Sequence, residues 1–366
     1  MPYVEGWEIA PQEGSPRSAV KLLTVLSVLL AVLFFLASFP AAVSATVKGR
    51  CKDCHEMHSD SASPELTKGG CLGCHAMDPA GTRNIIEIGN SPIPQVLHNM
   101  EDGDLAAGNF YYVADGFAPD YGKGHNVVGI SQLQPPPMDE PPGFIGSVMI
   151  PGGKGPTRWL ERQELTCAGT WGCHGDRTVE DPYKAVYGAH HEDDSVIDGS
   201  TVGKSYRYLF GIKGAEDRDW EYQATPAEHN GYKGDPQHMT MDTISYLCGE
   251  CHALFHPSIF LGGMAVGNHN PWHRHPTDVD LGSVHPTFPG SEYQSYMIYS
   301  LVTPVAFENP TGKESHVDER SIIMCLSCHR AHASPYKDSL RWDYTEMVAG
   351  ESRTGNSGCF TCHTLK

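Results

Sequence analysis

The segment Cys325-Leu-Ser-Cys328-His329 holds two cysteines separated by two residues and followed directly by histidine. Thiols at this spacing lie about one helical turn apart, so both can add to the vinyl groups of a single haem. The adjacent histidine can then turn its imidazole onto the iron as the proximal axial ligand. The segment therefore predicts a covalently attached c-type haem.

The same pattern, C-x-x-C-H, occurs four more times. One copy alone is a weak signal, because zinc sites and redox dithiols also use C-x-x-C. Zinc ribbons need no histidine after the second cysteine, and a thioredoxin-like protein has a single motif in a βαβ setting. Repetition therefore favours haem at all five motifs: Cys51, Cys54 and His55; Cys71, Cys74 and His75; Cys248, Cys251 and His252; Cys325, Cys328 and His329; and Cys359, Cys362 and His363.

The last two cysteines form a wider version of the motif, Cys167-Ala-Gly-Thr-Trp-Gly-Cys173-His174. Five residues intervene instead of two, and three of them are Ala or Gly, so the loop can bulge outward while both sulfurs stay near one haem. A short-loop disulfide beside a chance histidine is the alternative. Because every other cysteine is already paired in a motif, we expect six haem c groups, five at C-x-x-C-H and one at C-x-x-x-x-x-C-H.

The chain has 20 histidines, so a second imidazole is available for every iron. A histidine three or four residues after a proximal one lies on the same helical face and can reach the next haem; these are His58, His256 and His332. A histidine followed by Asn or Pro lies at a turn that can hold its ring; these are His125, His229 and His275. Contacts with solvent or propionates are the alternative for each, and Met is another possible ligand. Spacing does not choose among the other loop histidines, which include His98, His190 and His191.

Residues 1–45 have the organisation of a secretory signal peptide. A polar stretch ends with Lys21, an uncharged apolar stretch runs from Leu22 to Phe39, and small residues follow as far as Ala45. An uncleaved membrane anchor is the alternative, since about 18 apolar residues can just span a bilayer. The lack of a charged stop favours cleavage after Ala45. Residues 46–366 would then be exported to the periplasm, the outer surface or the extracellular space, with no membrane span.

Composition limits the fold and the partners. A formal net charge of -18 gives no basic footprint for nucleic acid. With 39 Gly and 27 Pro, we expect a mostly irregular, loop-rich and haem-cored fold with short helices and a few short strands. We predict one hexahaem domain over residues 46–366, with diheme units near 46–80 and 320–366. Within it we expect strands at 108–114, 144–150 and 296–307, a helix at 241–255 and an exposed Pro-rich loop at 134–142.

Beyond single motifs, the sequence resembles the multihaem cytochromes with doubled C-x-x-C-H motifs, which occur in metal- and sulfur-reducing bacteria. The resemblance is carried by the segments at 51–58, 108–113, 124–127, 165–174, 188–191, 274–278 and 324–336. It implies that Cys167 to His174 is a genuine haem site, and it favours His125, His191, His229 and His275 as distal ligands. Such proteins are similar in architecture to extracellular, filament-forming cytochromes of metal reducers.

The function we expect is electron transfer through closely spaced bis-histidine haems. Its partners would be other redox proteins, extracellular acceptors or further copies of the chain as a homopolymer. The alternative is a multihaem reductase with one open iron, best placed at Cys167 and Cys173, where the motif departs from the others. His58 has two possible roles, as a ligand in its own chain or as a ligand to a neighbouring subunit.

Overall fold

The computed structural model describes residues 47–58, 66–114, 120–130, 140–145, 163–257, 274–282, 298–348 and 358–363. The expected signal peptide, most of the Pro-rich loop and the end of the expected strand at 144–150 lie outside these residues. Contacts along the backbone group residues 44–366 into one unit. Within the described part, no helix has the length and apolar character needed to cross a membrane.

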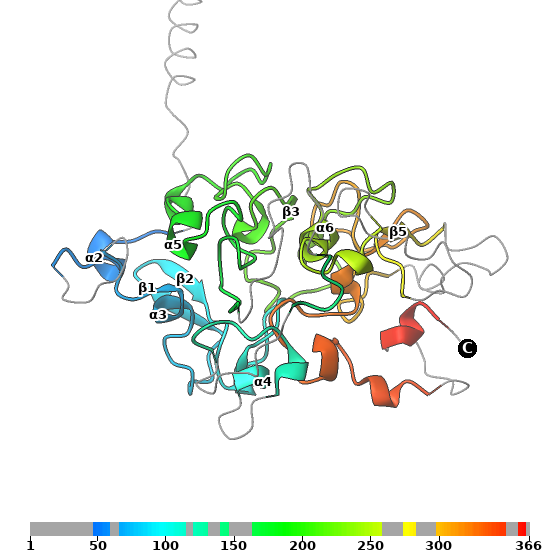
Figure 1. The fold of residues 1–366 in the computed structure, drawn as a ribbon, viewed down its shortest axis with the longest axis horizontal. Helices are drawn as coiled ribbons and strands as arrows, with labels where there is room; N and C mark the ends of the chain where they lie inside the picture. Colours follow the sequence, from blue (N-terminus) through cyan, green and yellow to red (C-terminus); the bar gives the residue numbers. More distant parts are fainter. Residues whose placement is uncertain are drawn as a thin grey trace, which may run out of the picture. The chain divides into compact units, whose positions relative to one another are not determined.

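Short helices carry most of the attachment motifs (Figure 1). Among the described residues, the longest helix is α6, at Ile244–Gly249. The other α-helices are α2 (Cys51–Cys54), α3 (Cys71–His75), α4 (Tyr111–Ala114) and α5 (Pro182–Ala185). The 3-10 turns are η2 (Met100–Asp102), η3 (Tyr121–Lys123), η4 (Ala189–His191), η5 (Tyr206–Tyr208), η6 (Ala253–Phe255), η8 (Cys325–Ser327), η9 (Lys337–Ser339), η10 (Tyr344–Glu346) and η11 (Gly358–Thr361).

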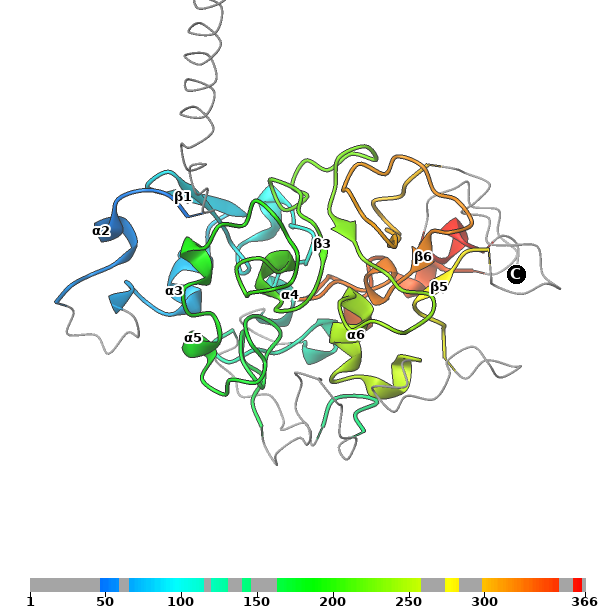
Figure 2. The same cartoon turned by 90° about the horizontal axis from the view of Figure 1, so that it is seen from above.

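Three two-stranded antiparallel sheets make up the strands among the described residues. The hairpin of β1 (Ile85–Ile88) and β2 (Ser91–Pro94) lies beside α3, as both views show (Figures 1 and 2). The pair β3 (Gly214–Ala215) and β4 (Gly231–Tyr232) and the pair β5 (Val279–Asp280) and β6 (Ile322–Ile323) are two residues long. The prediction of a loop-rich fold with short helices and a few short strands is confirmed.

The prediction of a strand at 108–114 is wrong, because the helix α4 occupies the second half of this segment. The reason is Asn109, whose side-chain oxygen accepts a hydrogen bond from the backbone N–H of Tyr111 at 3.0 Å and opens a helical turn. Gly108 just before it has φ +88°, and a Cβ there would meet the carbonyl oxygen of Ala333 at 1.9 Å. Such a close approach of two backbones requires glycine at this position.

Two other expected elements are shorter than predicted. The helix expected at 241–255 divides into α6 and η6; the side chain of Thr243 caps α6 by accepting from the backbone N–H of Tyr246 at 3.1 Å. The strand expected at 296–307 is reduced, in its described part, to isolated bridges at Ala306 and Phe307.

Candidate haem centres

We number the six attachment sites 1 to 6 in chain order, from Cys51 to His363. All twelve cysteines lie in the described residues, and none forms a disulfide. At sites 1, 4, 5 and 6, the backbone N–H of the motif histidine donates to the carbonyl of the first motif cysteine, at 2.8–3.1 Å. The turn thus brings both cysteines and the histidine to one place.

Site 3, with its wider loop, repeats this hydrogen bond. The N–H of His174 donates to the carbonyl of Cys167 at 3.0 Å, so the ends of the loop close as they do in the shorter motifs. The intervening residues bulge outward against the chain around them. A Cβ at Gly169 would meet the Val179 carbonyl oxygen at 2.6 Å, and one at Gly172 would meet the Thr166 carbonyl oxygen at 2.5 Å. Glycine is therefore what lets the wide loop fold back.

Five of the six motif histidines face a second histidine ring. The distances between ring centres are 6.0 Å for His55 and His191, 6.3 Å for His75 and His190, 6.4 Å for His174 and His332, 6.1 Å for His252 and His125, and 6.2 Å for His363 and His275. An ion held between two Nε2 atoms places the ring centres roughly 6.3 Å apart, because a metal–nitrogen bond is about 2.0–2.1 Å. These five pairs have the spacing that one shared iron requires.

Backbone carbonyls orient several of these rings. The Nδ1 atom of His75 bonds the carbonyl of Pro94 at 3.0 Å, that of His174 the carbonyl of Arg207 at 3.0 Å, and that of His252 the carbonyl of Pro142 at 2.8 Å. On the distal side, His125 bonds Ala331 at 2.8 Å and His275 bonds Pro276 at 3.0 Å in the same way. Since a carbonyl only accepts, Nδ1 carries the proton and Nε2 keeps its lone pair for a metal.

Burial also favours the neutral form of three of the paired imidazoles by lowering the pKa of each. It lowers the pKa of His190 to about 4, that of His252 to about 4 and that of His332 to about 3, with smaller contributions from neighbouring histidines. A neutral imidazole is the form that binds a metal. The chemistry of this donor set, two cysteines and a histidine at each site with a second imidazole opposite five of the six motif histidines, therefore fits a covalently attached haem.

Two of the other expected distal ligands, His229 and His256, contact different groups. His229 is buried, its two ring nitrogens lie at 2.8 and 3.1 Å from the carbonyls of Asn230 and Glu314, and its ring stacks on Tyr299 at 3.6 Å. His256 is also buried, and its Nε2 contacts the Asp278 carboxylate at 3.0 Å. Neither Nε2 is free for iron.

His190 lies opposite a motif histidine, although sequence reasoning did not choose it. It lies beside His191 in η4, a 3-10 turn in which consecutive side chains point about 120° apart. The two rings can therefore face different sites, with His191 opposite site 1 and His190 opposite site 2. The two consecutive histidines at 190–191 were the sequence signal that could have indicated a role for His190.

Site 5 differs from the others. Nδ1 of His329 bonds the Asp338 carbonyl at 2.7 Å, so its Nε2 is also left for a metal. Among the described residues, however, no histidine ring lies opposite it. His58, on the exposed end of the site 1 segment, faces no motif histidine within the described part either.

Motif cysteines connect each site to the next. The thiols of Cys71 and Cys167 share a hydrogen bond, which lowers the pKa of Cys71 to about 7. A hydrogen bond between the thiols of Cys248 and Cys325 raises the pKa of Cys248. These contacts join site 2 to site 3 and site 4 to site 5.

The remaining links are electrostatic. Three cysteines have a pKa that burial raises and that a cysteine of the adjacent motif raises further. They are Cys74, which is near Cys54; Cys251, which is near Cys173; and Cys328, which is near Cys362. They join sites 1 and 2, 3 and 4, and 5 and 6. Each attachment motif before the last thus has at least one cysteine near a cysteine of the next motif along the chain.

Comparison with known families finds a match to one part of the chain. Residues 316–366, which contain sites 5 and 6, match the model of the doubled CXXCH motif. The motifs upstream of this segment repeat the same spacing of cysteine and histidine, which is the pattern of c-type haem attachment.

Two solved structures are similar to the chain. One is the outer membrane cytochrome S filament from Geobacter sulfurreducens, with 17% identity, a TM-score of 0.41, and 84% of this chain and 87% of the other covered. The second is the OmcS nanowire from Geobacter sulfurreducens, with 17% identity, a TM-score of 0.38, and 88% and 92% covered. No curated protein matches the sequence.

Proposed function

We propose that the protein is an exported hexahaem cytochrome that carries electrons along a row of bis-histidine haems. The observation that carries this proposal is the set of five histidine pairs at 6.0–6.4 Å, each made of a motif histidine and one from elsewhere in the chain. The cysteine contacts between successive sites support close spacing along the row.

The residues at each site have separate roles. The two motif cysteines would hold the haem covalently, and the motif histidine and the histidine opposite it would bind its iron. When bound, haem supplies one-electron iron chemistry, whose potential the protein sets through ligands, burial and hydrogen bonds. The carbonyls on Nδ1 fix the tautomer of each ring and strengthen it as a ligand.

The reductase alternative needs an iron with an open face. Site 3, where the unusual loop pointed to an open iron, has His332 opposite His174, which argues against catalysis there. The alternative now rests on site 5, where no described histidine lies opposite His329. Binding of carbon monoxide to the assembled holoprotein would support it.

Site 5 also supports a homopolymer. We propose that His58 of a second copy supplies the missing ligand to His329, since both side chains are exposed and neither faces another motif ligand among the described residues. The acidic chain, with a net charge of -18, would otherwise favour basic redox partners. A test must distinguish His58 from alternative ligands in the same chain, which are the histidines outside the described residues: His269, His273 and His285.

The proposed function is tested by intact mass and ferric absorption spectra of the exported protein. Six covalent haems and low-spin iron throughout are the expected result. Fewer haems, or a high-spin band that persists after assembly, would contradict it.

A further inference from the structure

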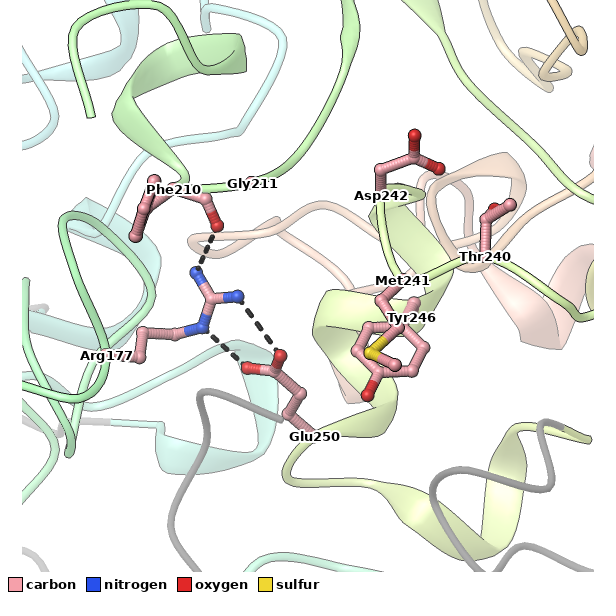
Figure 3. A pocket seen from close by; sticks show the side chains of 8 residues that line it. All are labelled: Arg177, Phe210, Gly211, Thr240, Met241, Asp242, Tyr246 and Glu250. Atoms are coloured by element: carbon pink, nitrogen blue, oxygen red, sulfur yellow. Dashed lines mark hydrogen bonds and ion pairs between the residues drawn. The ribbon is translucent and has the colours of Figure 1, made fainter. Parts of the chain in front are cut away.

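A buried ion pair connects the attachment loops of sites 3 and 4. Glu250 is the residue just before the second cysteine of the motif Cys248-Gly-Glu-Cys251-His252, and Arg177 follows His174 by three residues. Nε of Arg177 lies 2.5 Å from one carboxylate oxygen of Glu250, and Nη2 lies 3.1 Å from the other (Figure 3). Nη1 donates to the carbonyl of Phe210 at 3.3 Å, so the guanidinium is held on both edges.

Stability alone does not explain this pair. Each side chain is only 3% exposed, and removing two charges from water costs about as much as their attraction returns. Apolar side chains of similar size often serve a core equally well or better. The exposed ion pairs of the chain, such as Arg320 with Asp318, carry no such desolvation cost.

The position of the pair gives it a second effect. Glu250 lies inside the attachment loop of site 4, directly beside Cys251, and Arg177 follows the motif histidine of site 3 by three residues. The positive member of the pair thus comes from the segment of site 3, and the negative member comes from the loop of site 4.

We propose that Arg177 and Glu250 are positioning residues that hold sites 3 and 4 together and separate the reduction potentials of their two haems. A nearby positive charge favours the ferrous state, which carries one positive charge fewer, and a negative charge favours the ferric state. The potential is raised at site 3 and lowered at site 4. This inference rests on the proposed function, because it requires haem at both sites.

The test is a spectroelectrochemical titration of the holoprotein and four variants. Glu250→Gln leaves an arginine that cannot lose its charge, so we expect the reduction potentials at sites 3 and 4 to move in the positive direction. Arg177→Gln leaves the carboxylate, so these reduction potentials should move in the negative direction. The double variant should return toward the wild-type curve, and Arg177→Lys, which keeps the charge without the two-pronged contact, should keep the potentials and lose thermal stability. Arg320→Gln, at an exposed pair, is the control and should change nothing.

Opposite shifts in the two single variants support the proposal, because a purely structural role would move both potentials in the same direction. Equal shifts, or none, would overturn it. Intact mass separates this failure from a failure of the proposed function: a variant with six haems and unchanged potentials sinks only the inference, whereas wild-type protein without haem at site 3 or 4 sinks both. If Arg177→Gln loses a haem, the comparison of Glu250→Gln with Arg177→Lys still shows whether loss of the negative charge shifts the reduction potentials in the positive direction.

Discussion

The centres of the imidazole rings of His174 and His332 lie 6.4 Å apart, although His174 belongs to the motif of site 3 and His332 follows the motif of site 5. His332 follows the proximal histidine of site 5 by three residues, yet it faces site 3. Its ring also stacks on Phe110 at 4.6 Å, and its backbone N–H donates to the carbonyl of Ala107 at 2.8 Å. The site 5 segment thus closes the site that has the least usual loop.

Replacing His332 with Ala should open the iron at site 3. We expect one iron in six to become high-spin and to bind carbon monoxide, because no second imidazole would remain opposite His174. Ferric absorption and EPR spectra measure this change. His316→Ala is the matched control, since His316 is exposed and bonds only the neighbouring Ser315 hydroxyl. Identical spectra for both variants would contradict the assignment.

Sequence reasoning chose four of the five histidines that the structure places opposite a motif histidine. His125, His191, His275 and His332 lie near a motif or match the family resemblance. His229 and His256 met the same local criteria, but burial gave their rings other partners. A tertiary contact of this kind has no signature in local spacing.

The predicted elements failed where the side chain of one residue overrode the local pattern. Apolar alternation from Gly108 to Ala114 suggested a strand, but the side chain of Asn109 opened a helical turn instead. The loop-rich fold was easier to predict, because glycine, proline and five attachment motifs leave little room for long helices.

Substituting both cysteines of site 3 by Ser should remove one haem and leave five. The two thiols are the only covalent attachment of that haem, whereas the other sites keep their own. Intact mass before and after removal of non-covalent ligands gives the number directly. Wild-type protein with five haems and a disulfide between Cys167 and Cys173 would refute the sixth site.

The side chain of Asn109 should matter for stability. It is fully buried, its oxygen accepts from Tyr111 N–H at 3.0 Å, and its amide donates to the His98 carbonyl at 2.8 Å. Asn109→Ala leaves buried backbone groups unpaired and should lower the free energy of unfolding by roughly 1–3 kcal/mol. Thermal unfolding of the holoprotein measures the loss. Ser200→Ala, at an exposed turn, is the control and should cost far less.

His58→Ala should abolish assembly while the subunit keeps its fold and its six haems. If His58 completes site 5 of a neighbouring subunit, the isolated wild-type subunit already lacks that ligand, so the variant and the wild-type monomer should have the same spectrum. Electron microscopy and light scattering at high concentration measure assembly. Filaments formed by the variant would exclude this role. So would wild-type protein that stays monomeric with every iron six-coordinate.

The central claim, that histidine pairs close both faces of the irons, is tested most directly by an experimental structure of the holoprotein. We predict iron between His55 and His191, His75 and His190, His174 and His332, His252 and His125, and His363 and His275, with His58 of a neighbouring copy on the iron of His329. An iron at any of the first five sites bound by Met, by water or by a different histidine would contradict the account at that site. Such a result at site 3 would restore the reductase as the better explanation.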